Sequence, residues 1–236
     1  MKKRLLLGGI AAAFSALVLA AYFFGFKQAP TGADTRSARP ATVDVVALRA
    51  CAEQGQPQAQ VQLGRLYAKG EQVTNSYTEA AKWYAKAAEQ GDAEGRLALG
   101  ELLEAGQGVR RDLPKAITLY RLAAEQGCAG AQYTLGFLYE AGRGVPGDQV
   151  AASRWFLLAA EQGDPLAQYD LGQRYDLGVG VAVDHIEAYK WLTLAAAQGQ
   201  SDSKSRLKRV KAKMTRQEIA EAKRRVAGFS AQKSRS

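Results

Sequence analysis

The chain of 236 residues carries 32 Lys and Arg residues against 23 Asp and Glu residues, a net charge of +9, with one histidine and two cysteines. This length allows one or two domains, and one histidine with two separated cysteines excludes the ligand cluster of a structural zinc site. The charge is uneven: residues 51–200 carry 13 basic and 18 acidic groups, whereas residues 201–236 carry 12 and three.

The chain begins with a short basic stretch followed by a long apolar run. Residues 2–4 are basic, and the next 22 residues, 5–26, are uncharged and mostly apolar. A helix of that length can span about 30 Å of hydrocarbon. We therefore expect residues 1–27 to be a signal anchor in the inner membrane of a bacterium, single-pass, with the rest of the chain in the periplasm. The alternative is a cleaved signal peptide and a soluble periplasmic or secreted protein, with 18–20 as the cleavage site.

The next segment predicts a linker and then half of a repeat. Residues 28–46 contain Pro, Gly, Ser, Thr and Ala without an apolar period, which predicts a flexible linker. Residues 47–56 match the second half of the repeat described below, since Gly55 lies 36 positions before Gly91. A lone second helix here would cover the open end of a repeat array as an N-terminal half-repeat cap.

Residues 57–200 contain four copies of one unit with a 36-residue period. Each copy has a glycine in its first half and ends in a Gln-Gly pair; the copies are 59–91, 95–127, 131–163 and 167–199. A fixed period in this range predicts a solenoid, because each unit buries its apolar face only against its neighbours.

Each unit is predicted to be a helical hairpin. In the third copy, the apolar residues between Ala131 and Tyr139 lie on one face of a helix. Gly142 ends that helix, and Asp148 has the position of an N-cap for a second one. The copies differ in places: Gln72 replaces the second loop glycine, and Gly95 replaces the opening alanine and should weaken the start of its helix.

The pattern A-x-x-x-L-G-x-x-Y-x-x-G-x-G-V-x-x-D-x-x-x-A-x-x-W-[YF]-x-x-A-A-x-Q-G resembles the Sel1-like repeat, a relative of the tetratricopeptide repeat. We therefore expect an all-α fold, a right-handed solenoid of αα-hairpins, with an N-terminal transmembrane or signal helix and C-terminal capping helices. The resemblance implies that protein partners bind the concave surface formed by the first helices of the units.

Residues 201–229 are predicted to form basic capping helices, and residues 230–236 a disordered tail. Thr215 and Glu218 form a capping-box sequence at the start of the second of these helices. The basic residues are either a solvated face or a contact to anionic lipid or cell-wall polymer. The sequence argues against nucleic acid, because no reader motif accompanies them. The residues predicted for the anionic contact are Lys208, Arg209, Lys211 and Lys213.

The cysteines and the histidine predict no chemistry. Cys51 and Cys128 lie about two units apart, too far for a disulfide; Cys51 is expected in the core and Cys128 in an exposed turn. His185 is expected in the first turn of a helix, beside its cap. We expect no catalytic residue, no cofactor and no metal.

The candidate partner-binding residues lie on the first helices, away from the core stripe. Phe137 is either an exposed anchor for a partner or a residue packed on the adjacent helix. The acidic residues at 104, 140 and 176 would place carboxylates along one edge, suited to a basic or polar ligand. The full set is Arg65, Glu101, Glu104, Thr134, Phe137, Glu140, Asp170, Gln173 and Asp176.

The expected function is that of a non-enzymatic scaffold or adaptor for other proteins of an envelope complex. One alternative is a secreted or envelope hydrolase, because some Sel1-type proteins carry a β-lactamase label. The S-x-x-K motifs at Ser201 and Ser230 lack the partner motifs that this chemistry needs. A second alternative is an electrostatic anchor through the basic C-terminal helices.

Overall fold

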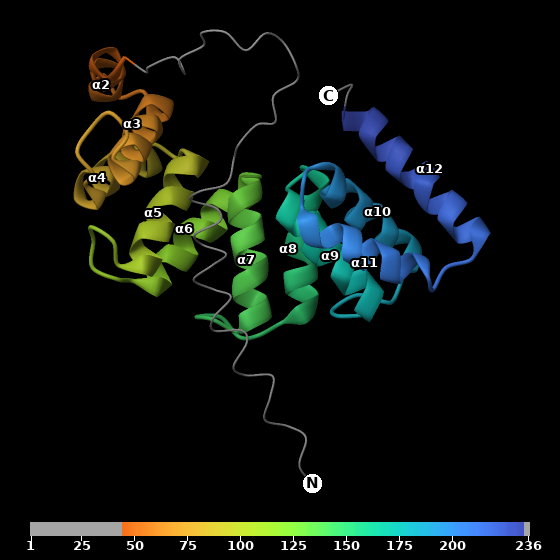
Figure 1. The fold of residues 1–236 in the computed structure, drawn as a ribbon. Coiled ribbons are helices and arrows are strands. Elements are labelled where there is room, and N and C mark those ends of the chain that lie inside the picture. Colours follow the sequence, from red (N-terminus) through yellow and green to blue (C-terminus); the bar gives the residue numbers. More distant parts are fainter. Residues whose placement is uncertain (1–43, 234–236) are drawn as a thin grey trace, which may run out of the picture. The chain divides into compact units, whose positions relative to one another are not determined.

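Residues 44–233 are the part of the chain that the computed structural model describes, and within them every regular element is a helix (Figure 1). The predicted anchor at 1–27, most of the predicted linker, and residues 234–236 of the predicted tail lie outside the described residues. The prediction of an all-helical solenoid is confirmed.

Four helical hairpins follow one another along the chain. Their first helices are α3 (Pro57–Lys69), α5 (Ala93–Ala105), α7 (Ala129–Ala141) and α9 (Pro165–Leu177). Their second helices are α4 (Tyr77–Glu89), α6 (Leu113–Glu125), α8 (Gln149–Glu161) and α10 (His185–Ala197). The helices that flank the hairpins are α2 (Val45–Glu53), α11 (Ser201–Lys211) and α12 (Arg216–Lys233).

The helix ends follow from the residues at the caps. Each first helix of a hairpin ends at a glycine in the left-handed conformation, as Gly142 does at φ 62°, because glycine adopts positive φ without steric cost. Each second helix begins after a Ser or Asp whose side chain caps the first turn. Asp148, for example, accepts hydrogen bonds from the N–H groups of Val150 and Ala151.

A glycine at a constant position allows the two helices of each hairpin to pack closely. A Cβ atom placed at Gly136 would lie 2.7 Å from the Phe156 ring, and one at Gly100 would lie 2.6 Å from the Tyr120 ring. Both distances are shorter than van der Waals contact. The glycine is therefore a packing requirement: the large side chain of the second helix occupies the space where a Cβ would be.

A buried glutamine joins neighbouring helices in three of the four units, the second unit having Arg96 at this position. The Gln132 side chain donates to the carbonyl oxygen of Ala124 in the preceding helix at 3.1 Å and accepts from Gln162 at 2.7 Å. The same bonds recur at Gln60 and Gln168. Because the buried amide bonds both neighbours, it fixes the order and spacing of three successive helices.

Two helix boundaries and the solvent exposure of one cysteine differ from the prediction. Helix α2 begins at Val45, inside the predicted linker, because Asp44 caps its first turn. Helix α12 continues to Lys233, beyond the predicted start of the tail at residue 230. Cys128, predicted to be exposed, is buried, and burial raises the pKa of its thiol to about 12. Cys51 is half-buried and packs against a core cluster of Ala52, Ala59, Leu63 and Trp83.

The two C-terminal helices pack differently from a hairpin. Helix α11 packs on α10, in the place of a further first helix, whereas α12 packs on α10 and makes few contacts with α11 (Figure 1). The α10–α12 contact contains an edge-on pair of Trp191 and Phe229, with ring centroids 5.4 Å apart, and an ion pair of Glu187 and Arg225 at 2.7 Å.

Candidate functional site

The first helices form the inner side of the stack. Side chains link neighbouring first helices: Arg65 of α3 pairs with Glu94 of α5 at 2.7 Å, and the Tyr133 hydroxyl of α7 donates to Asp170 of α9 at 3.0 Å. Residues at the inner positions of α3, α5, α7 and α9 therefore follow one another across the concave face. One such row consists of Arg65, Glu101, Phe137 and Gln173, all of which retain solvent exposure.

Phe137 lies near the middle of this row and is half-buried. It is neither fully covered by the adjacent helices nor fully presented to solvent, so part of its ring remains available to a partner. Thr134 lies one turn earlier on the same helix, where its hydroxyl donates to the carbonyl oxygen of Gly130 at 2.9 Å. The centre of the concave face is thus an apolar ring beside a satisfied hydroxyl.

Two carboxyl groups on the concave face have strongly raised pKa values. Burial raises the pKa of Glu101 to about 8, and the nearby Glu94 and Glu104 carboxylates add to the effect. Burial also raises the pKa of Asp170 to about 7, although the hydroxyl of Tyr133 donates to it at 3.0 Å and opposes the shift. Both groups are partly protonated near neutral pH, and a cation brought to this face would favour their charged form.

The predicted carboxylate edge is largely occupied by contacts between units. Glu104 is buried and accepts from the Tyr120 hydroxyl at 2.8 Å and pairs with Arg143 of the next unit at 2.9 Å. Asp176 is buried and pairs with Lys213. These two residues do not present carboxylates to a ligand, contrary to the prediction, because the following segment of the chain covers and neutralises them.

Glu140 keeps more exposure but is also paired. It bonds the buried guanidinium of Arg174 at 2.7 Å, and Arg174 also donates to Gln149 and Ser153. The third member of the predicted edge therefore links two units as well. Lys213, predicted to contact an anionic surface, is likewise neutralised by its partner on α9.

Glu94 is a residue of the concave face that the sequence did not single out. It is exposed on α5, pairs with Arg65 of the preceding unit at 2.7 Å, and contributes to the raised pKa of Glu101. In the sequence Glu94 lies in the first turn of a predicted helix, where a glutamate is commonly found because it interacts favourably with the helix dipole. Its place in the repeat frame, one turn before Ala98, is the signal that could have identified it.

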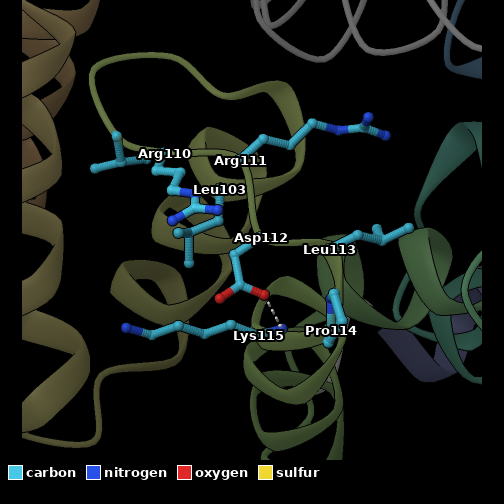
Figure 2. Close-up of a pocket in the computed structure, with 8 residues that line it drawn as sticks. Leu103, Arg110, Arg111, Asp112, Leu113, Pro114 and Lys115 are labelled. Atoms are coloured by element: carbon cyan, nitrogen blue, oxygen red, sulfur yellow. Dashed lines mark hydrogen bonds between the residues drawn. The ribbon is translucent and has the colours of Figure 1, made fainter.

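The structure shows an open depression at the turn between α5 and α6 (Figure 2). Arg110, Arg111 and Lys115 give it a positive rim, and Asp112 uses its carboxylate to cap α6 by accepting from the Lys115 N–H at 3.0 Å. The Arg111 side chain donates to the carbonyl oxygen of Glu104. Asp112 and Arg111 therefore serve the turn itself.

The described residues contain no arrangement that would hold a metal ion. Among residues 44–233, no three His, Cys, Asp or Glu side chains are grouped as metal ligands. His185 lies 3.6 Å from the Asp176 carboxylate at the start of α10, a contact between neighbouring helices. Within the same residues, no helix has the length and apolar character needed to cross a membrane.

Comparison with known proteins identifies the repeat. The model of the Sel1 repeat matches residues 57–92, 93–128, 129–164 and 165–200. A Sel1 repeat protein from Oxalobacter formigenes is similar in structure, with 38% identity and a TM-score of 0.66 over 70% of this chain and 48% of that one. A protective antigen of uropathogenic Escherichia coli strains is similar at 32% identity and a TM-score of 0.67, over 80% of this chain and 41% of that one.

A third solved structure supports the fold alone: an immunity protein from Pseudomonas aeruginosa matches at 23% identity and a TM-score of 0.52, over 84% of this chain and 69% of that one. No curated protein matches the chain. The chain spans less than half the length of the first two solved proteins. Four matched repeats nevertheless cover more than half of the sequence, and the chain therefore belongs to the Sel1 repeat family.

Proposed function

We propose that the protein is a non-enzymatic adaptor at the bacterial cell envelope, and that it binds another protein on its concave face. Sel1 repeats generally bind other proteins, which supports the class of function. The envelope location rests on the basic residues 2–4 and the apolar run 5–26, which favour an inner-membrane anchor with the repeats on the periplasmic side.

The observation that carries the proposal is the row Arg65, Glu101, Phe137, Gln173. These residues occupy one position of the repeat, spaced by 36 residues, and differ in charge and size while the core positions stay constant. A partner crossing the row would meet a cation, a carboxyl group, an aromatic ring and an amide in succession. Aromatic residues are frequent anchors at protein interfaces, so Phe137 is the expected centre of the contact.

The two raised pKa values indicate which kinds of side chain a partner would carry. Glu101 and Asp170, on either side of Phe137 in the repeat order, are carboxyl groups that burial keeps partly protonated. A lysine or arginine of a partner would convert them to carboxylates and form charge-assisted bonds. We therefore expect an extended segment with an apolar residue for Phe137 and basic residues on both sides of it.

The test is photo-crosslinking in cells from a photoreactive residue at position 137, followed by mass spectrometry of the captured protein. The control carries the same photoreactive residue at Leu158, which is 43% exposed on the second helix α8. A distinct protein captured from 137, absent from 158, and lost with Glu101→Lys would support the proposal. Equal capture from both positions, or capture unaffected by the charge reversal, would refute it.

A further inference from the structure

Helix α11 has the position of a first helix in a fifth unit. It packs on α10 as α9 packs on α8. In the 36-residue frame, Ser203 corresponds to the buried Ala167, and Val210 to Arg174; both Ser203 and Val210 are fully buried. The face of α11 toward α10 is therefore built like that of the other first helices.

The face of α11 on which a second helix would pack breaks the pattern of the repeat. In each of the four units, a second helix packs over a glycine of the first, and the residue corresponding to Gly136 and Gly172 in α11 is Lys208. Lys204 corresponds to the buried Gln168, and Lys211 to the half-buried Tyr175. These three lysines are one and two turns apart on a single helix face, which we call the lysine stripe.

The lysine stripe is open. Helix α12 does not cover it, because α12 packs on α10 instead (Figure 1). Lys204, Lys208 and Lys211 are all exposed, and none of their side chains forms an ion pair or hydrogen bond with another described residue. Two of the three neighbouring cations differ in this respect, since Lys213 pairs with Asp176 and Arg206 donates to the Tyr169 hydroxyl at 3.2 Å, whereas Arg209 is exposed like the lysines.

The stripe is incompatible with a helix packed in the manner of a second helix of this repeat. A second helix of this repeat requires a residue without a side chain at position 208, because a Cβ at each corresponding glycine would lie within 2.7 Å of the side chain packed over it. A lysine there prevents both a further repeat and a second copy of the chain from continuing the stack. The charge of the stripe instead favours an occupant that accepts three flexible, hydrated ammonium groups.

We propose that the lysine stripe binds the anionic phospholipid headgroups of the membrane that anchors the chain. Lysines present mobile point charges, which suit a fluid layer of phosphates, whereas arginine forks are preferred for fixed bidentate partners. This inference rests on the membrane anchor of the proposed function and not on the concave face.

The experiment measures acetylation of each lysine by mass spectrometry in the full chain reconstituted into vesicles. Vesicles of phosphatidylcholine containing phosphatidylglycerol are compared with vesicles of phosphatidylcholine alone. Phosphatidylglycerol should slow acetylation of the three stripe lysines by roughly fivefold or more. Lys82 and Lys115, exposed on second helices, should be acetylated equally in both. The protection should disappear at high salt, where the Debye length falls to about 3 Å.

A variant pair checks that the charge of the stripe is responsible. For the full chain added to preformed vesicles without reconstitution, the triple change Lys204→Gln, Lys208→Gln, Lys211→Gln should lower the phosphatidylglycerol-dependent part of vesicle binding in flotation by on the order of 100-fold. The control removes three exposed cations elsewhere, by Lys115→Gln, Arg121→Gln and Arg154→Gln, and should leave binding unchanged.

The outcomes separate the stripe from the anchor. If the chain fails to float with neutral vesicles, the anchor is wrong, and binding to phosphatidylglycerol vesicles that the triple variant loses would still support the stripe. If the chain floats and the stripe lysines react equally on both kinds of vesicle, the stripe proposal is overturned. Protection by an acidic polypeptide such as polyglutamate, with none from phosphatidylglycerol, would also overturn it and assign the stripe to a protein.

Discussion

At the scale of single residues, charged side chains in this protein have two different surroundings. Carboxylates at the ends of first helices, such as Glu104, are buried and neutralised by the next unit. Carboxyl groups farther along the concave face, such as Glu101 and Asp170, are desolvated without a full ion pair, and their pKa values rise. The first kind contributes to stability, and we propose the second kind as contacts for a partner.

The raised pKa of Glu101 predicts a pH-dependent stability. Because its pKa rises from 4.5 to about 8 on folding, its protonated form favours the folded state; this contribution is complete below pH 4.5 and is lost as the pH rises through 8. Glu101→Gln stays neutral at every pH. The variant should therefore gain about 1–2 kcal/mol relative to the wild type between pH 5 and pH 9, measured by urea unfolding. An exposed control, Glu125→Gln, should show no such gain, and an equal gain in both variants would contradict the account.

Removing the cation beside Glu104 should be costly. Arg143→Ala leaves that buried carboxylate with the Tyr120 hydroxyl alone, and we expect a loss of about 2–3 kcal/mol in unfolding free energy. Adding Glu104→Gln to the same chain should recover part of the loss, because no charge then remains buried. Lys69→Ala, which breaks an exposed pair with Glu71 at 3.8 Å, should cost less than about 1 kcal/mol. Similar losses in both single variants would rule out a special role for the buried pair.

The sequence could predict which residues lie on the first helices but not which of them are covered. The repeat frame placed Glu104 and Asp176 at one edge correctly, yet their burial depends on side chains from other segments, Arg143 and Lys213, that occupy no common position in the frame. Glu101 was named for its place in the row. Its raised pKa depends on the packing around it and had no sequence signal.

At the scale of helices, glycine positions determine how closely the elements pack. The 3.6-residue period, the caps and the glycines were enough to predict the helical hairpins. The sequence did not reveal that the opening Gly95 fits a close approach to the preceding helix, where a Cβ would lie 2.6 Å from that of Ala87. It also did not reveal that α12 leaves the position of a second helix, although Lys208 at the glycine position is the residue that would have indicated it.

The packing glycine predicts a specific loss of stability. Gly136→Ala would place a methyl group against the Phe156 ring, and we expect a cost of about 1–3 kcal/mol in unfolding free energy despite the better helix propensity of alanine. The matched control is Gly228→Ala in α12, where a Cβ would meet nothing within 4 Å. This control should be neutral or slightly stabilising. A Gly136→Ala variant as stable as the control would show that the close approach is not required.

The loop of the first unit predicts a gain. Gln72 has φ 62° in the position of the second loop glycine, a conformation that is strained for any residue with a side chain. In the other units this glycine lies against the start of the preceding second helix, as Gly108 does against Tyr77, whereas the Gln72 side chain is exposed. Gln72→Gly should raise the unfolding free energy by roughly 0.5–1 kcal/mol, measured by urea denaturation. A decrease would mean that the glutamine contributes a contact that offsets its strain.

At the scale of the whole described unit, ion pairs and glutamine bonds join each hairpin to the next. Glu104 pairs with Arg143, Glu140 with Arg174, and Asp176 with a residue beyond α11. The constant core therefore positions a variable row on the concave face. The two ends of the stack close differently: α2 covers one end, and the lysine stripe prevents addition of a further repeat at the other. The fold follows from the repeat pattern, whereas the partner depends on the few residues that vary.

The central claim is that the concave face binds a protein around Phe137. The most direct measurement is the dissociation constant, by calorimetry, of the captured partner for the wild type, for Phe137→Ala and for Arg154→Ala, which changes an exposed residue of α8. The account predicts at least about tenfold weaker binding for Phe137→Ala, as expected for an interface anchor, and no change for Arg154→Ala. Unchanged affinity for Phe137→Ala, with folding intact by circular dichroism, would contradict the account.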